Sequence, residues 1–182
     1  MALLSCDPGQ LMRMKKLKIY SLIGLILTLG YAQAAVGGLS NASTEMVVLG
    51  KDEGRFGKPK IALWVDGGLM VCEGSGQDGY KRIIAQSINN NGATEGAPII
   101  CSQATKGIHD LKPRIKAVTD TVAVIVWVSG ERGDENIFMR LVNRSGIPIS
   151  EIMRVNENAA KGQTNPAVSA SRGDGFIVGW ES

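Results

Sequence analysis

A repeat of about 54 residues constrains this chain more than any other feature of its sequence. Five landmark pairs lie 54 positions apart, so the first two copies align without a gap: Pro59 and Pro113, Ser75 and Ser129, Ile83 and Ile137, Asn89 and Asn143, Gly92 and Gly146. A third copy follows at an offset of 53, where Pro166, Trp180 and Ser182 match Pro113, Trp127 and Ser129. A constant offset over this length predicts one supersecondary unit repeated in tandem.

Each copy contains four short segments typical of strands. The first follows the proline, at 60–64, 114–118 and 167–170, and the second is an unbroken apolar run, at 69–72, 122–128 and 176–180. The third covers 83–88 and 137–142, and the fourth covers 99–102 and 152–156. Proline is tolerated where a strand begins. Unbroken apolar runs predict a second strand that is covered on both faces.

Four antiparallel strands in roughly 50 residues are typical of a β-propeller blade. We therefore predict an all-β fold, a β-propeller-like array of four-stranded antiparallel blades. The array is incomplete, at about 2.7 blades, because a closed propeller takes at least about four, and a signal-peptide helix precedes it. An immunoglobulin-like sandwich, which needs about 100 residues per domain, and a β-solenoid are the alternatives.

The N-terminal residues differ from the rest of the chain and predict export. A basic cluster precedes an apolar run at 19–32 that ends in the small-x-small pattern Ala32-Gln33-Ala34; the cluster consists of Arg13, Lys15, Lys16 and Lys18. These are the regions of a secretory signal peptide, and an uncleaved membrane anchor is the alternative. Export would place the protein in the periplasm, on the cell surface or outside the cell.

The predicted organisation has three parts. We assign a signal peptide to 1–34, of which 1–13 can be an over-extended start, and a linker to 35–44. A partial β-propeller-like domain follows at 45–182, with repeats that begin near 57, 111 and 164 and a last copy truncated at Ser182. The chain has 20 basic and 17 acidic residues, and 16 of each remain after 1–34 is removed. This balance, with scattered Lys and Arg, excludes a basic nucleic-acid surface.

The third copy also carries a recognisable motif. Its residues are Val155-Asn156, Gly162-Gln163, Pro166, Val168, Asp174-Gly175, Ile177-Val178, Trp180 and Ser182, and the second copy keeps Pro113, Ile115, Val126, Trp127 and Ser129. This P-x-V…G-x-x-V-x-W-x-S pattern resembles the tandem propeller-type repeats of large bacterial secreted or surface proteins, some of them calcium-linked. The first copy departs from the pattern, with Glu73 at the tryptophan position. The resemblance implies a fold more than an activity.

Arg-Gly-Asp occurs twice, at Arg132-Gly133-Asp134 and at Arg172-Gly173-Asp174. Both tripeptides fall in predicted hairpin turns, where an exposed copy can present itself to an integrin-type receptor. Gly-Asp pairs are also ordinary turn chemistry, and the two tripeptides occupy different points of the repeat. We expect turns here rather than adhesive sites.

No catalytic, cofactor-binding or metal-binding set is complete in the sequence. His109 is the only histidine, so neither a histidine pair nor a histidine-rich metal site can form. The segments 77–79 and 134–136 offer oxygen ligands in a turn, but they lack the alternating carboxylates that calcium needs. Propeller glycosidases use carboxylate pairs, and Glu73 is the one interior-looking carboxylate. An atypical terminal repeat explains Glu73 more simply.

Cys72 and Cys101 fall on the second and fourth predicted strands of one blade. In a meander these strands are about 9.5 Å apart, which is beyond the reach of a disulfide. We predict two free, buried thiols.

Export, a packing repeat and the missing catalytic set favour a non-catalytic binding or scaffold module of the cell envelope or extracellular space. Its propeller loops would contact a glycan or a protein. The alternative is the N-terminal fragment of a secreted propeller hydrolase whose catalytic residues lie beyond Ser182. We expect no nucleic-acid partner and no membrane association after signal cleavage. Self-association or further blades are expected to complete the fold, because open sheet edges invite pairing.

Overall fold

The computed structural model describes residues 56–76, 78–103, 105–157, 162–171 and 173–182, all within a compact unit that begins at Val47. The predicted signal peptide, the linker and the start of the repeat domain lie outside the described residues. Within these ranges every regular element is a strand. The described residues contain no helix that is long and apolar enough to cross a membrane. The predicted all-β fold with antiparallel four-stranded sheets is therefore confirmed.

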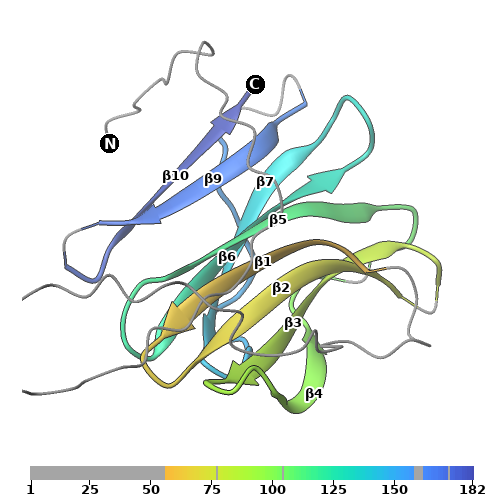
Figure 1. Cartoon of the computed structure of the whole chain (residues 1–182). Coiled ribbons are helices and arrows are strands. Elements are labelled where there is room, and N and C mark those ends of the chain that lie inside the picture. The colour runs from red at the N-terminus through yellow and green to blue at the C-terminus, as the bar shows by residue number, and fades with distance from the viewer. Residues whose placement is uncertain (1–55, 77, 104, 158–161, 172) are drawn as a thin grey trace, which may run out of the picture. The chain divides into compact units, whose positions relative to one another are not determined.

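The strands form three antiparallel sheets in chain order (Figure 1). The first is the meander β1-β2-β3-β4, with bounds Gly57–Trp64, Gly67–Ser75, Lys81–Asn89 and Thr94–Ile100. The second is the meander β5-β6-β7-β8, with bounds His109–Ala117, Val122–Gly130, Asn136–Asn143 and Met153–Arg154. The third is the hairpin of β9 and β10, with bounds Thr164–Ala170 and Phe176–Glu181.

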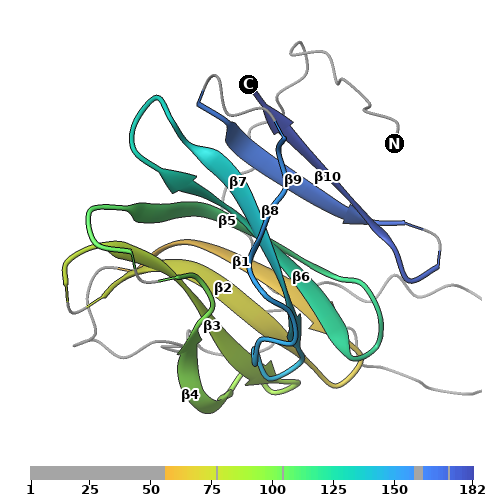
Figure 2. The same cartoon turned by 180° about the vertical axis from the view of Figure 1, so that it is seen from behind.

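The sheets lie one after another as layers, with the β5–β8 sheet between the other two (Figures 1 and 2). Alternate residues of β6 face its two neighbours, as the pleat requires. Ala123, Ile125 and Trp127 belong to a buried cluster with residues of the β1–β4 sheet. Val124, Val126 and Val128 belong to a second cluster with residues of the hairpin. The prediction of a second strand covered on both faces holds for β6.

The same expectation fails for β10. Its residues Phe176, Val178 and Trp180 pack against the β5–β8 sheet, but Ile177 on the opposite face is 59% exposed. The described residues provide no layer over that face, so this apolar run is covered on one side alone.

The three repeat prolines lie inside strands rather than at their entry, which corrects the predicted position. In each first strand the residue before the proline has a left-handed backbone: φ is 55° at Lys58, 52° at Lys112 and 50° at Asn165. The strand pairing shifts register across the same points. The prolines therefore sit at β-bulges, one of the few places where a sheet accommodates the missing N–H.

Strand register also corrects one repeat landmark. Ile83 pairs with Glu73, whereas Ile137 pairs with Val128, so Cys72 and not Glu73 lies at the position of Trp127. Likewise Gly74, not Ser75, lies at the position of Ser129. The β1–β2 turn is the cause, because it has two residues, 65–66, whereas a Val118-to-Val122 hydrogen bond encloses three residues, 119–121, in the β5–β6 turn.

The polar contacts at strand ends recur at an offset of 54. The Oδ1 atoms of Asn89 and Asn143 each accept two backbone N–H groups of the turn that follows. The backbone N–H groups of Ile83 and Ile137 donate to Ser102 Oγ and Asn156 Oδ1, at 3.0 Å and 2.8 Å. Side chains thus accept hydrogen bonds from the same backbone N–H groups in both four-stranded sheets.

Cys72 lies on β2, and Cys101 lies one residue after β4. Both are free and buried, as predicted. Burial raises the pKa of Cys72 to about 11 and that of Cys101 to about 12.

These two thiols should resist alkylation in the folded chain. At pH 8 very little of either thiol is ionised, and the thiolate is the reactive form. We expect iodoacetamide to leave both cysteines unmodified under conditions that fully alkylate the unfolded chain, as measured by peptide mass mapping. Rapid modification of Cys72 or Cys101 in the folded chain would show that the thiol is accessible and would contradict the packing described here.

Candidate functional site

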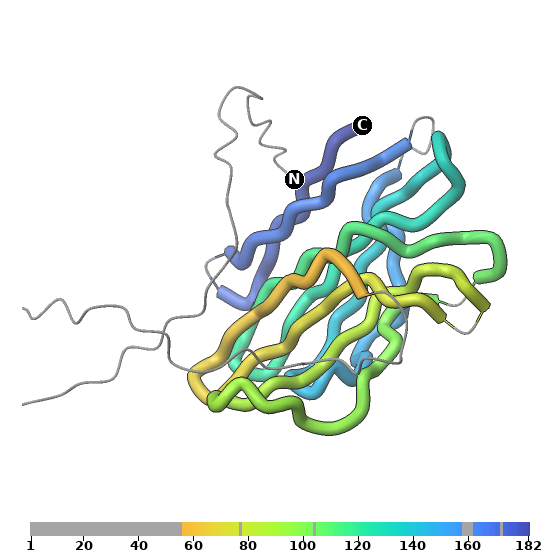
Figure 3. Tube along the Cα trace, turned by 45° about the vertical axis from the view of Figure 1, so that its right-hand side comes forward, coloured from red at the N-terminus to blue at the C-terminus, as the bar shows by residue number. Residues whose placement is uncertain are grey.

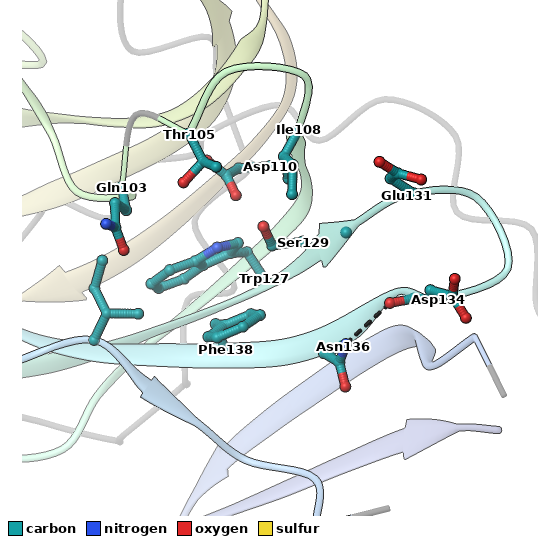
Figure 4. A pocket seen from close by; sticks show the side chains of 12 residues that line it. Gln103, Thr105, Ile108, Asp110, Trp127, Ser129, Glu131, Asp134, Asn136 and Phe138 are labelled. Carbon is teal, nitrogen blue, oxygen red and sulfur yellow. Dashed lines mark hydrogen bonds between the residues drawn. The ribbon is translucent and has the colours of Figure 1, made fainter. Parts of the chain in front are cut away.

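A cavity of about 370 Å³ opens beside the β5–β8 sheet (Figure 4). We call it the Trp127 pocket. Its walls come from the connection between β4 and β5, from the ends of β6 and β7 with the turn between them, and from the segment before β8. The lining residues are Gln103, Thr105, Ile108, Asp110, Trp127, Ser129, Gly130, Glu131, Asp134, Asn136, Phe138 and Ile152.

Two stacked aromatic rings form the inner part of the pocket. The rings of Trp127 and Phe138 have centroids 6.3 Å apart and an interplanar angle of 24°. They lie directly across β6 and β7 from one another, where cross-strand aromatic pairs make contact. Trp127 is only 1% exposed, so the half-buried Phe138 presents most of the aromatic surface that a ligand can reach.

Asp110 is the most unusual polar residue of the pocket. It is 3% exposed, and the polar side-chain groups of Ser129, Ser102 and Trp127 lie near its carboxylate and favour its charged form. Its Oδ2 atom has no hydrogen-bond partner, and Arg82 Nη1 lies 4.0 Å from it. Burial raises the pKa of Asp110, although these groups and the charge of Arg82 oppose the shift.

Arg82 fixes the β4–β5 wall of the pocket from behind. This arginine of β3 is 1% exposed. Its Nη1 atom donates to the backbone oxygen of Ile108 at 2.8 Å, and its Nη2 atom donates to that of Thr105 at 3.2 Å. Nη2 also forms an ion pair with Asp78 at 2.7 Å. A buried guanidinium with these partners holds the connection in one position.

The repeat offers a comparison for Asp110. At an offset of 53, Gln163 takes the place of Asp110 and Trp180 that of Trp127, and Trp180 Nε1 donates to Gln163 Oε1 at 2.7 Å. In the second copy the group near the indole is the Asp110 carboxylate instead of an amide. This equivalence assigns Asp110 a structural task, that of holding the tryptophan.

The mouth of the pocket contains one of the two Arg-Gly-Asp tripeptides. Residues 132–134 lie in the β6–β7 turn, and Asp134 lines the pocket. Asp134 N–H donates to the backbone oxygen of Glu131, and its own oxygen accepts the amide Nδ2 of Asn136 at 2.9 Å (Figure 4). Gly133 has a φ of 98°, which favours glycine.

The second tripeptide lies apart from the pocket. Gly173 and Asp174 are exposed residues of the β9–β10 turn, and Arg172 lies outside the described residues. The β6–β7 turn joins a second strand to a third, whereas the β9–β10 turn joins a first strand to a second. The structure therefore brings the two tripeptides to different ends of their strands.

Glu73, weighed from the sequence as an interior carboxylate, has a structural contact. Its Oε1 atom accepts the backbone N–H of Lys112 at 2.8 Å, at the bulge of β5. Lys112 Nζ in turn donates to Thr164 Oγ1 and Asn165 Oδ1, at 2.6 Å and 3.0 Å. This ladder links the bulges of neighbouring sheets, and it does not reach the Trp127 pocket.

The turns considered for calcium are separate from one another. Asp78 pairs with Arg82, while Asp134 and Asn136 line the pocket. Among the described residues no group of three or more His, Cys, Asp or Glu side chains is placed to hold a metal ion. A smaller cavity of about 210 Å³ lies near Trp64 and Arg144, where Arg144 pairs with Asp66 and lies over the Trp64 ring.

The sequence indicates Trp127 and Asp134 but not the pocket that they share. Trp127 was expected as a packing landmark and Asp134 as a turn residue. Phe138 could have been found, because strands joined by a short turn bring residues near the turn into register. Gln103 and Thr105 come from the connection between the sheets and Asp110 from the start of β5, where the sequence carries no periodic signal.

Comparison with protein-family models, with curated proteins and with solved structures found no match for this chain.

Proposed function

We propose that this chain is an exported, non-catalytic binding and scaffold module, and that a glycan is held in the Trp127 pocket and by the turns beside it. The observation that carries the proposal is the pairing of an aromatic surface at Phe138 with carboxylate and amide groups around the opening. The export-type N-terminal sequence supports the proposed location in the periplasm, on the cell surface or outside the cell.

The chemistry of the pocket favours a polyhydroxylated ligand. Its volume, about 370 Å³, lies in the range of small-molecule sites, roughly 300–1,000 Å³. The carboxylates of Glu131 and Asp134 accept hydrogen bonds, while the amides of Gln103 and Asn136 both donate and accept. The described residues that line the pocket include no lysine or arginine, which favours a neutral ligand over an anionic one such as a phosphate.

We also propose that the three sheets form part of a β-propeller-like array. The sheets are stacked face to face, and two apolar clusters fill the interfaces between them. The first strand of each sheet contacts the first strand of the next: β1 contacts β5, and β5 contacts β9. In such an array the turns after second strands gather on one side. This arrangement supports the use of the β6–β7 turn as a ligand-contacting loop.

A hydrolase is the second candidate, and the carboxylates of the pocket are the observation in its favour. Glycosidases of most families work with two carboxylates across the scissile bond. Asp110 is a poor acid for this task, because it is nearly inaccessible and serves Trp127 as Gln163 serves Trp180. Glu131 and Asp134 remain as exposed carboxylates, without a buried partner of raised pKa that can reach a substrate.

The test is a glycan array followed by titration calorimetry with each bound glycan, and by assay of the same glycans for cleavage. We expect binding without turnover. Asp134→Asn should weaken binding about tenfold or more, since a hydrogen bond to a charged group contributes about 1.5–3 kcal/mol. Hydrolysis of a bound glycan would reject the non-catalytic proposal and support the hydrolase.

Asp174→Asn is the matched control, because it makes the same change in the other Arg-Gly-Asp turn. The pocket proposal expects its affinity for the glycan to equal that of the unaltered chain. Equal losses in both variants would instead indicate that the tripeptides, rather than the pocket, hold the ligand.

A further inference from the structure

The edges of the three sheets are protected, with one exception. Five of the six edge strands of the described sheets are either interrupted by proline or very short: β1 has Pro59, β4 has Pro98, β5 has Pro113, β9 has Pro166, and β8 has two residues. Proline and shortness are two of the devices by which proteins block pairing with a further strand. β10, with the sequence FIVGWE, contains no proline, lysine or arginine.

The backbone of β10 presents regular hydrogen-bonding groups at this unprotected edge. Ser171 N–H donates to the oxygen of Gly175, so the pairs two and four residues further along are also hydrogen-bonded pairs. Ile177 and Gly179 therefore direct their N–H groups toward β9. The N–H and C=O of Val178 point the opposite way, and no described strand pairs with them.

The β5–β8 sheet leaves apolar side chains of β7 partly uncovered where a strand beside β10 would lie. The first sheet shows the covered arrangement: Ala85 of β3, the strand that pairs with β2, is fully buried in a cluster with Val142 of β7. Met139 holds the position of Ala85 in the second sheet. With Leu141, it is only partly buried against the cluster shared with the hairpin. Figure 3 shows β9 and β10 next to each other at one end of the stack of sheets. By the repeat, a strand beside β10 would lie over β7 and cover both side chains.

We infer that the free edge of β10 binds one further antiparallel strand, a mostly apolar segment with the chemistry of β7 (NIFMRLVN). The occupant is a single strand rather than the β10 of a second folded copy. A two-fold axis that pairs two β10 strands antiparallel keeps both sheets facing the same way. Each β5–β8 sheet would then extend, through β7 and β8, into the space of the other.

A peptide with the sequence of β7, Asn136–Asn143, is the probe. In β7 Arg140 pairs with Ile125 of β6, and Val178 holds the position of Ile125 at the offset of 53. The same register would place the arginine of the peptide opposite Val178. A peptide with the sequence of β4, Thr94–Ile100, is the matched control, since it comes from a natural edge strand and contains Pro98.

The experiment is fluorescence anisotropy of each labelled peptide titrated with the chain. We expect the β7 peptide to bind and the β4 peptide to bind at least tenfold more weakly. Val178→Pro should weaken the β7 peptide about fivefold or more, because it removes one N–H at the free edge. Val178→Ala is the control, because it also loses side-chain contacts but keeps that N–H. It should bind the β7 peptide as tightly as the unaltered chain does.

Three results would overturn the inference. These are equal binding of both peptides, no effect of Val178→Pro, or a dimer of the chain that depends on Val178 and is not displaced by the β7 peptide. The glycan titrations are independent of this edge. A failure here leaves the Trp127 pocket untouched, and a failure of glycan binding leaves the edge untouched.

Discussion

Trp127→Ala should lower the free energy of unfolding by about 3–5 kcal/mol, the range for removal of a large buried aromatic side chain. Trp127 is 1% exposed, belongs to the cluster between the two four-stranded sheets, and stacks on Phe138. Its loss leaves a cavity there and removes the indole group near Asp110. Urea unfolding followed by circular dichroism measures the change, because that signal does not rely on tryptophan.

Trp180→Ala supplies the comparison within the same chain. Trp180 holds the same position in the third repeat, but it is only partly buried. Its removal should cost less than half as much as the removal of Trp127. Equal costs would mean that the interface between the four-stranded sheets adds nothing to the burial of Trp127, and the layered packing would then be wrong.

Arg82→Leu should destabilise the chain by a similar amount, about 3–5 kcal/mol, because breaking a buried ion pair leaves an uncompensated charge. The variant loses the donors to Thr105 and Ile108 and leaves Asp110 without a nearby cation. Arg82→Lys is the graded control, since one ammonium group cannot replace both arms of the guanidinium. An unfolding free energy within about 1 kcal/mol of the unaltered chain would contradict this role for Arg82.

The cost of Arg82→Leu should also depend on pH. Burial raises the pKa of Asp110 in the folded chain, and loss of the arginine charge raises it further. Because the pKa of Asp110 is higher in the folded chain than in the unfolded chain, Asp110 stabilises the fold fully at pH values below its unfolded pKa of about 3.9. This stabilisation is lost as the pH rises through the folded pKa. The variant should therefore be closer in stability to the unaltered chain at pH 4 than at pH 7. The double variant with Asp110→Asn should remove that difference.

The strands were predictable because their signals are local. Apolar runs such as 122–128, together with asparagine and glycine turns, indicate strand and turn without any reference to the rest of the chain. The all-β class and the four-strand unit follow from these signals. The prediction that Glu73 lies at the position of Trp127 was wrong, because Cys72 holds that position, and the reason is also local. A shorter β1–β2 turn shifts the register by one residue, and the longer β2–β3 turn conceals the shift in the offset of later landmarks.

The pocket was less predictable because its residues come together only after the sheets pack. Trp127 and Phe138 are neighbours through β6 and β7, but Gln103 reaches them from the connection before β5 and Asp110 from the start of β5. The buried charge of Arg82 lies on β3, in a strand otherwise rich in apolar residues. No periodic pattern in the sequence predicts that Arg82 of the first sheet donates hydrogen bonds to the connection between β4 and β5.

The most direct test of the proposed function is the location of a bound glycan. Backbone amide chemical shifts, measured while the chain is titrated with a glycan identified on the array, report which residues the ligand contacts. We predict the largest shifts at 129–136, 103 and 105–110, around the Trp127 pocket. Shifts centred on the cavity near Trp64 and Arg144, or no binding of any glycan, would contradict the proposed function.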